Sequence, residues 1–177
     1  MLSNRTHFVK TGLLLTTTLM TTQLLGTKSL QAQGTPAPKK EVSVTAPLAI
    51  TAKTDQPTYK ADSAIKLTLI AKNTTQQEVP VRISSGQRYD FELFRGKSAK
   101  GEKVWQWSKG RMFTMMLSSI SLKPGKPLEY SETYRPGGDG MPALPPGFYT
   151  VVATFKGVTK TTPPVSMPSA AATFQVN

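Results

Sequence analysis

Large apolar residues alternate with polar ones along two short stretches in the middle of the chain. In residues 89–93 every second side chain is large and apolar while those between are charged, and residues 105–107 repeat this two-residue spacing. Such a period is typical of β-strands with one buried face. Because Gly96 and Gly101 lie between the stretches and permit tight turns, the pattern predicts a β-hairpin at the centre of a β core. The side chains expected on its buried faces are Tyr89, Phe91, Leu93, Trp105 and Trp107.

The same period recurs along the rest of the chain, with turns rich in Pro, Gly and Asn between the stretches. No stretch shows a sustained 3.6-residue repeat, so helices are expected to be nearly absent. The turn spacing predicts an all-β, immunoglobulin-like or fibronectin-like antiparallel sandwich of about seven to nine strands. The chain has no cysteine, so the sandwich has no disulfide and its core is held by packing alone. The other stretches predicted as strands are 48–52, 65–71, 79–83, 115–122, 128–134, 148–155 and 172–176.

Two residues add detail to this fold. Pro80 lies in the stretch 79–83 and has no backbone N–H, so we expect that strand at the edge of a sheet. Tyr149 follows a Pro-Pro-Gly turn at the start of the stretch 148–155. This position is that of the tyrosine corner in immunoglobulin-like sandwiches, where the hydroxyl donates to the backbone a few residues upstream.

The first residues have the features of a secretory signal peptide. Arg5 and Lys10 precede an uncharged, leucine-rich run, and the small residues near Ala32 suit a cleavage site. The run is shorter than the ~20 residues of a spanning helix, although a retained membrane anchor is the alternative. We therefore expect a signal peptide in residues 1–32, a flexible Pro- and Lys-rich linker in 33–47 and one domain in 48–177. After cleavage the mature protein is expected to have no membrane span and to be exported to a periplasm or out of the cell.

The chain is strongly basic, with a formal net charge of +12. Three basic residues and no acidic one precede the expected cleavage site, so the mature chain carries +9. For an exported protein the acidic partners at hand are surface polysaccharides, phospholipid head groups or an acidic protein, and nucleic acid is not expected. A surplus of charge also keeps a protein soluble without any partner, which is the alternative explanation.

The mature chain lacks the side chains that most enzymes and metal sites use. It has no cysteine, and the single histidine, His7, lies in the predicted signal peptide. Triads and dyads built on histidine, and metal sites built on imidazole or thiolate, therefore cannot form, and we expect no catalysis, metal or cofactor. Asp90 and Glu92 would serve an enzyme that works through carboxylates, but strand alternation favours a solvated face for both. The methionines in 112–116 are expected to fill core space.

A series of motifs follows in order from the predicted hairpin towards the end of the chain. The motifs are Ser85-Gly86-Gln87 with Tyr89, Asp90 and Phe91; Val104-Trp105 with Trp107, Ser108, Gly110 and Phe113; Leu122 with Pro124-Gly125; and Pro146-Gly147 with Tyr149. Over about residues 67–155 this series resembles the BsuPI family, named for a bacterial intracellular inhibitor of a subtilisin-type serine protease. The resemblance implies a compact β-sandwich that binds a protease rather than catalysing a reaction.

An inhibitor must hold an extended loop that a protease binds as it binds a substrate, rigidly enough for cleavage to be slow. Two long, proline-rich connections, 137–146 and 158–168, contain apolar side chains of the kind that a subtilisin-type pocket accepts. Alternatively, both are ordinary connections without such a role. The candidate protease-binding residues are Met141, Leu144 and Met167.

The leading hypothesis is therefore an exported, non-catalytic, protein-binding β-sandwich whose partner is a subtilisin-type serine protease. The alternative is a cell-envelope adhesion module that binds an anionic polysaccharide through its charge and its exposed aromatic residues. Ionic strength distinguishes the two hypotheses, since salt screens exposed charges and leaves tight loop-mediated inhibition largely unchanged.

Overall fold

The computed structural model describes residues 47–160 and 169–177, which form eleven β-strands and no helix. This part of the chain accordingly contains no helix long and apolar enough to cross a membrane. The expected signal peptide, most of the expected linker and Met167 lie outside the described residues. The strands are β1 (Leu48–Thr54), β2 (Thr58–Tyr59), β3 (Ile65–Asn73), β4 (Val79–Ile83), β5 (Tyr89–Arg95), β6 (Lys103–Gln106), β7 (Ser118–Leu122), β8 (Leu128–Tyr134), β9 (Gly147–Phe155), β10 (Gly157–Thr159) and β11 (Ser169–Val176).

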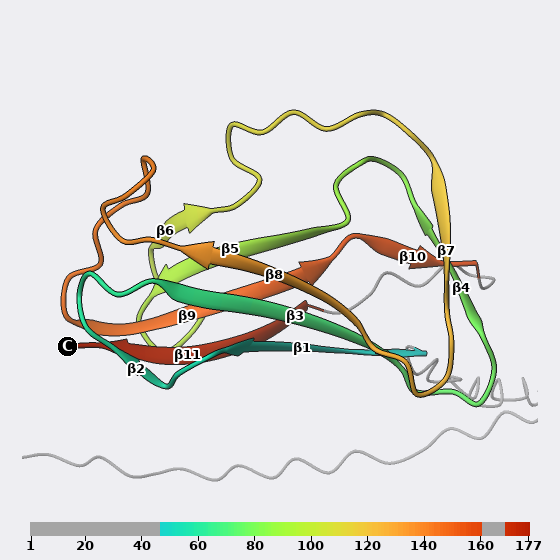
Figure 1. Cartoon of the computed structure of the whole chain (residues 1–177), viewed down its shortest axis with the longest axis horizontal. Coiled ribbons are helices and arrows are strands. Elements are labelled where there is room, and N and C mark those ends of the chain that lie inside the picture. Colours follow the sequence, from blue (N-terminus) through green and yellow to red (C-terminus); the bar gives the residue numbers. More distant parts are fainter. Residues whose placement is uncertain (1–46, 161–168) are drawn as a thin grey trace, which may run out of the picture. The chain divides into compact units, whose positions relative to one another are not determined.

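The strands form three sheets with the orders β1-β3-β8, β2-β11-β9-β5-β6 and β10-β4-β7. Paired strands are antiparallel except β11 and β2, which run parallel. In Figure 1 the long strands of the first two sheets run along one another, whereas β4 and β7 cross them at one end. The predicted all-β sandwich is confirmed. The structure has eleven strands where seven to nine were predicted, and the two short strands β2 and β10 account for the excess.

Alternate residues of the long strands build the core between the first two sheets. In β3 the predicted period is confirmed, because Ile65, Leu67, Leu69 and Ala71 are all fully buried. Aromatic residues dominate the opposite sheet. A one-residue slip of any of these strands would turn its apolar set towards water, so the core also fixes the register of the sheets. The buried hydrophobic residues of that opposite sheet are Tyr59, Phe91, Leu93, Tyr149, Val151, Ala153, Phe155, Phe174 and Val176.

The predicted hairpin is present, but it lies at the edge of the five-stranded sheet and not at its centre. Strands β5 and β6 pair with Leu93 opposite Trp105, and Gly96 in the turn adopts a φ of 103°, which favours glycine. Phe91 is fully buried, whereas Trp105 and Trp107 are only half-buried because β6 is the last strand of its sheet. The hairpin therefore contributes one strand to the core and one to the surface.

Pro80 does not lie on an edge strand, so that prediction is wrong. Its strand, β4, is the middle strand of the third sheet, between β10 and β7. The pairing with β10 covers only residues 81–83. No residue of β10 is therefore opposite Pro80, which explains how a central strand tolerates a proline there.

The predicted tyrosine corner is confirmed. Tyr149 is buried, and its hydroxyl donates a hydrogen bond to the carbonyl oxygen of Pro145 at 2.7 Å. Burial raises the pKa of the Tyr149 hydroxyl above its ordinary value. The bond ties the end of the connection between β8 and β9 to the start of β9.

Candidate functional site

The connection between β6 and β7 arches away from the sheets, as Figure 1 shows, and it carries a run of exposed apolar side chains. The exposed fractions are 99% for Met112, 93% for Met115, 58% for Met116 and 72% for Leu117. We refer to residues 112–117 as the exposed segment. Two predictions are wrong here: no strand begins at residue 115, since β7 begins at Ser118, and the methionines do not fill the core.

Contacts at both ends hold the exposed segment in place. The ring of Phe113 lies 5.7 Å from that of Trp107, and the backbone N–H of Gly86 donates to Thr114 O at 2.8 Å. Immediately after the segment, Ser118 pairs with Ile83 of β4. Between these fixed points, Met115 makes no hydrogen bond to another described residue, and neither does Met116. The segment is tethered on both sides and presents its methionines to solvent.

Asp90 fixes the turn that leads into the exposed segment. Its side chain was expected on a solvated face, yet the residue is only 2% exposed. The carboxylate accepts hydrogen bonds from Gln106 Nε2 at 2.7 Å and from Ser108 N and Oγ at 3.1 and 2.6 Å. Glu92 pairs with Lys103 Nζ at 2.8 Å, across the hairpin. Both carboxylates thus hold β6 and the turn after it.

A stack of aromatic rings underlies this turn and joins the two main sheets. Trp107 stacks on Tyr89 with ring centroids 4.6 Å apart, and Tyr89 stacks on Tyr130 of β8 at 4.5 Å. The Tyr89 hydroxyl donates to Glu132 Oε1. Burial, and then the Glu132 carboxylate that this hydroxyl contacts, raise the pKa of Tyr89. The exposed segment meets the end of this stack, where Phe113 packs on Trp107.

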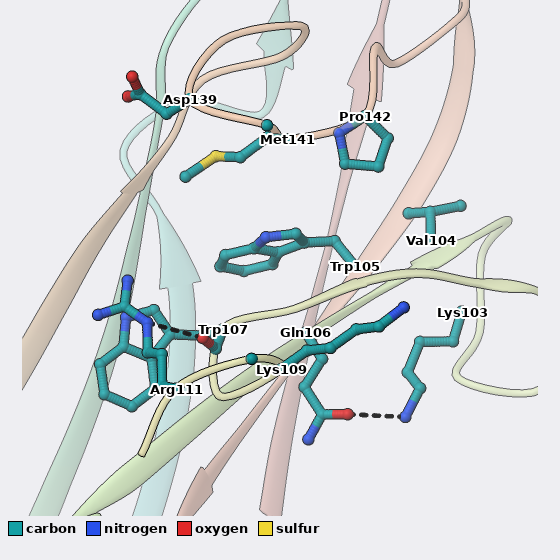
Figure 2. Close-up of a pocket in the computed structure, with 12 residues that line it drawn as sticks. Lys103, Val104, Trp105, Gln106, Trp107, Lys109, Arg111, Asp139, Met141 and Pro142 are labelled. Carbon is teal, nitrogen blue, oxygen red and sulfur yellow. Dashed lines mark hydrogen bonds between the residues drawn. The ribbon is translucent and has the colours of Figure 1, made fainter. Parts of the chain in front are cut away.

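A shallow pocket of about 520 Å³ lies next to this turn, between β6 and the connection from β8 to β9. Its volume is within the range of about 300–1,000 Å³ that small-ligand sites occupy. Figure 2 shows the Trp105 indole in the middle of the pocket, with Met141 on one side of it and the side chains of Lys109 and Arg111 on the other. We refer to it as the Trp105 pocket.

The wall opposite β6 is a loop with a defined conformation. The hydroxyl of Tyr134 donates to Pro142 O at 2.6 Å, and Met141 N donates to Gly138 O at 2.8 Å. Asp139 adopts a φ of 53°, a left-handed conformation that aspartate tolerates better than most residues. Burial raises the pKa of Tyr134 to about 12, so its hydroxyl keeps its proton, and this hydrogen bond, at neutral pH.

Of the three predicted protease-binding residues, the structure describes two, Met141 and Leu144. Leu144 is 2% exposed and belongs to the core, so the expectation of an exposed side chain is corrected: a protease pocket cannot take it in this conformation. Met141 is half-buried, packs against the core and lines the Trp105 pocket. Met167 lies outside the described residues, and a protease-binding role for it and for Met141 stays a prediction. Sequence reasoning missed the exposed segment, whose one signal was an apolar run without a clean two-residue period.

The chemistry that the described site offers is that of a binding surface. It combines exposed thioether side chains, a half-buried indole and two basic side chains next to one another. Within residues 47–160 and 169–177, no group of three or more His, Cys, Asp or Glu side chains could hold a metal ion.

Known structures resemble the chain only distantly, and no curated protein matches it. A CARDB domain from Pyrococcus furiosus matches at 14% identity over 73% of this chain and 87% of its own, with a TM-score of 0.40. Spo0M, a sporulation control protein from Bacillus subtilis, matches at 10% identity over 75% of this chain and 49% of its own, with a TM-score of 0.36. A β-glucosidase from Erythrobacter marinus matches at 9% identity over 73% of this chain, with a TM-score of 0.41, and this match spans only 15% of that enzyme. None of these similarities supports a conclusion about function.

A family profile gives a more informative match. The profile of the intracellular proteinase inhibitor family, BsuPI, matches residues 52–160, which is more than half of the chain. This range contains the β5–β6 hairpin, the exposed segment and the Trp105 pocket. The motifs that resemble the family lie within the same range. The chain belongs to the intracellular proteinase inhibitor family, BsuPI.

Proposed function

We propose that the chain is an exported inhibitor of a subtilisin-type serine protease and that the protease binds the exposed segment. Membership of a proteinase inhibitor family supports inhibition, and the sequence pattern of residues 1–32 supports export. The observation that carries the choice of segment is the exposure of Met115 and Met116 between two fixed points, Thr114 and Ser118.

A segment with a restricted backbone suits inhibition because fixing the backbone of a free residue on binding costs about 1–2 kcal/mol. Here the tether at Thr114 and the strand at Ser118 already restrict the chain. The free backbone of Met115 and Met116 can add to the edge of a protease's substrate cleft in the manner of an extended peptide. One methionine side chain then fills the apolar pocket that selects substrates, and slow release keeps the protease blocked.

Inhibition of a purified subtilisin-type protease by the mature protein tests the proposal. Met115→Ala and Met116→Ala should each raise the inhibition constant, and the larger effect should be about 30-fold, as for a residue that dominates an interface. The matched control is Phe148→Ala, which removes another exposed apolar side chain, 38% exposed, from β9. This control should inhibit as well as wild type.

Two results would overturn the proposal. The absence of inhibition by wild-type protein at micromolar excess over a panel of subtilisin-type proteases would remove the function. Inhibition that survives the double variant of Met115 and Met116 would remove the exposed segment as its cause. Export has its own measurement: the N-terminal sequence of the protein recovered from the producing cells should begin at Gln33.

A further inference from the structure

The Trp105 pocket contains a flat indole ring whose Nε1 has no hydrogen-bond partner among the described residues. Trp105 packs edge-on against Tyr134, with ring centroids 5.0 Å apart and an angle of 76° between the planes. Its indole is half-buried, and Nε1 makes no hydrogen bond to any other residue that the structure describes. Figure 2 shows the ring standing in the middle of the pocket, so that a flat ligand can lie against it. The ring therefore offers one apolar surface and one hydrogen-bond donor.

Two cations on one side of the pocket have no acidic partner within the described residues. Lys103 is paired with Glu92 and also donates to Gln106, whereas neither Lys109 nor Arg111 takes part in an ion pair. Arg111 lies over the Trp107 ring at 4.4 Å and donates from Nε to the Trp107 carbonyl oxygen at 2.9 Å. These contacts orient the guanidinium and leave its two terminal nitrogens for an anion.

The other side of the pocket carries an acceptor. Asp139 lines it, and its carboxylate has only a long contact to Arg135, 3.6 Å, between two largely exposed side chains. The loop that presents Asp139 is held by Tyr134 and by the turn bond from Met141 to Gly138. Cations and acceptor thus lie on different sides of the indole, so a ligand ring that lies on the side of Lys109 and Arg111 does not also meet Asp139.

We propose that the Trp105 pocket binds an acidic sugar ring, a hexuronate unit. The C–H face of the sugar lies on the side of the Trp105 indole that faces Lys109 and Arg111, and these two cations meet its carboxylate. A neutral sugar lacks the group that the cations attract, and a flexible acidic chain lacks the flat C–H face that rests on the indole. This site goes beyond protease inhibition and does not depend on it, since Trp105 and Lys109 lie outside the exposed segment.

The indole N–H signals in a ¹H–¹⁵N NMR titration report on this site directly, because the chain has only two tryptophans. Galacturonate should shift the Trp105 signal and saturate with a dissociation constant of about 1 mM, in keeping with the limited affinity of small ligands. Galactose should bind at least about tenfold more weakly, as it lacks the carboxylate. Trigalacturonate distinguishes the sources of the sugar: tighter binding than the monomer indicates a polysaccharide, and equal binding indicates a free acid.

Variants distinguish binding in the Trp105 pocket from attraction by the net charge of the protein. Trp105→Ala removes the reporting indole, so its titration is followed by the backbone amide signals of β6, which should no longer shift. Lys109→Gln, at an exposed position that leaves the fold intact, should weaken binding about fivefold. Lys123→Gln removes an equal charge after β7, outside the pocket, and should bind as wild type. Equal affinity for galactose, unchanged binding by Lys109→Gln or equal weakening by Lys123→Gln would each overturn the proposal. Tighter binding of tetraglutamate than of galacturonate would also overturn it, in favour of an acidic peptide.

Discussion

Strand β5 and the exposed segment are both rich in large apolar side chains, and they place them in opposite environments. Phe91 and Leu93 of β5 are fully buried, whereas Met112 and Met115 are 99% and 93% exposed. The difference follows from their neighbours. Strand β5 pairs with β6 and β9, but Met115 has no hydrogen-bonded neighbour among the described residues. Apolar composition alone does not decide burial; a two-residue period and paired neighbours do.

Strand β5 therefore contributes to stability, whereas the exposed segment offers a surface for binding. Burying a large apolar side chain stabilises a fold by about 1.5–3 kcal/mol, so β5 contributes to the free energy of unfolding. An exposed run of methionine contributes almost nothing until a partner covers it, and contiguous exposed apolar surface commonly marks an interaction site. Variants in the two regions should therefore divide cleanly between effects on stability and effects on binding.

The largest loss of stability is expected from the buried side of this comparison. Phe91→Ala should lower the free energy of unfolding by about 3–5 kcal/mol, because it opens a cavity between the sheets. Urea denaturation measures the change, and Phe91→Leu, which keeps most of the volume, should cost less than about 1.5 kcal/mol. A loss below 1 kcal/mol for the alanine variant would show that the ring does not pack as described.

A smaller loss is expected where the two regions meet, at Asp90. Asp90→Ala leaves both donors of Ser108 without their acceptor and leaves Gln106 Nε2 only its bond to Ser108 Oγ, which should cost about 2 kcal/mol in the free energy of unfolding. The turn before the exposed segment should also loosen, so protease inhibition should weaken. Glu92→Ala is the matched control, since its ion pair with Lys103 is exposed and should contribute less than about 1 kcal/mol. Equal losses for the two variants would contradict the role given to Asp90.

The regular strands of the fold could be predicted from the sequence, because the alternation of apolar and polar residues within a strand indicates which face is buried. The periods at β3 and β5 predicted both strands, and the turn before Tyr149 predicted the tyrosine corner. Asp90 was placed wrongly because alternation assigns a residue to a face without saying what covers that face. Here the turn at Ser108 folds back over it, which is a tertiary contact.

The candidate site was harder to predict for the same reason. Leu144 lies in a proline-rich connection that has every local feature of an exposed loop. It is buried, and the hydroxyls of Tyr134 and Tyr149 hold the connection that contains it, at Pro142 and Pro145. The bond from Tyr149 was predicted as the tyrosine corner, but the bond from Tyr134 joins β8 to the loop and has no signal in the loop's own residues. The exposed segment has the opposite character, since its composition suggests a core and only its missing period indicates otherwise.

The contribution of Tyr134 to stability, through the loop of the Trp105 pocket, should depend on pH. Its folded-state pKa of about 12 lies above the unfolded value of about 10. The stability that this raised pKa represents is therefore complete below pH 10 and is lost as the pH rises towards 12. Tyr134→Phe should cost about 1 kcal/mol at pH 7, through the lost bond to Pro142, and should show a shallower alkaline decline than wild type. Parallel urea-denaturation profiles from pH 9 to pH 12 would contradict this.

The smallest effect on stability is expected in the exposed segment itself. Met112→Gln and Met115→Gln should each change the free energy of unfolding by less than about 0.5 kcal/mol, because both side chains already contact water. Met141→Gln is the matched control, since that methionine packs against the core and should cost more. If the urea midpoints of the Met112 and Met115 variants fall as far as that of the Met141 variant, the segment packs onto the domain in solution. If they stay at the wild-type value while Met115→Gln weakens inhibition, the apolar side chain at position 115 serves binding and contributes nothing to the fold.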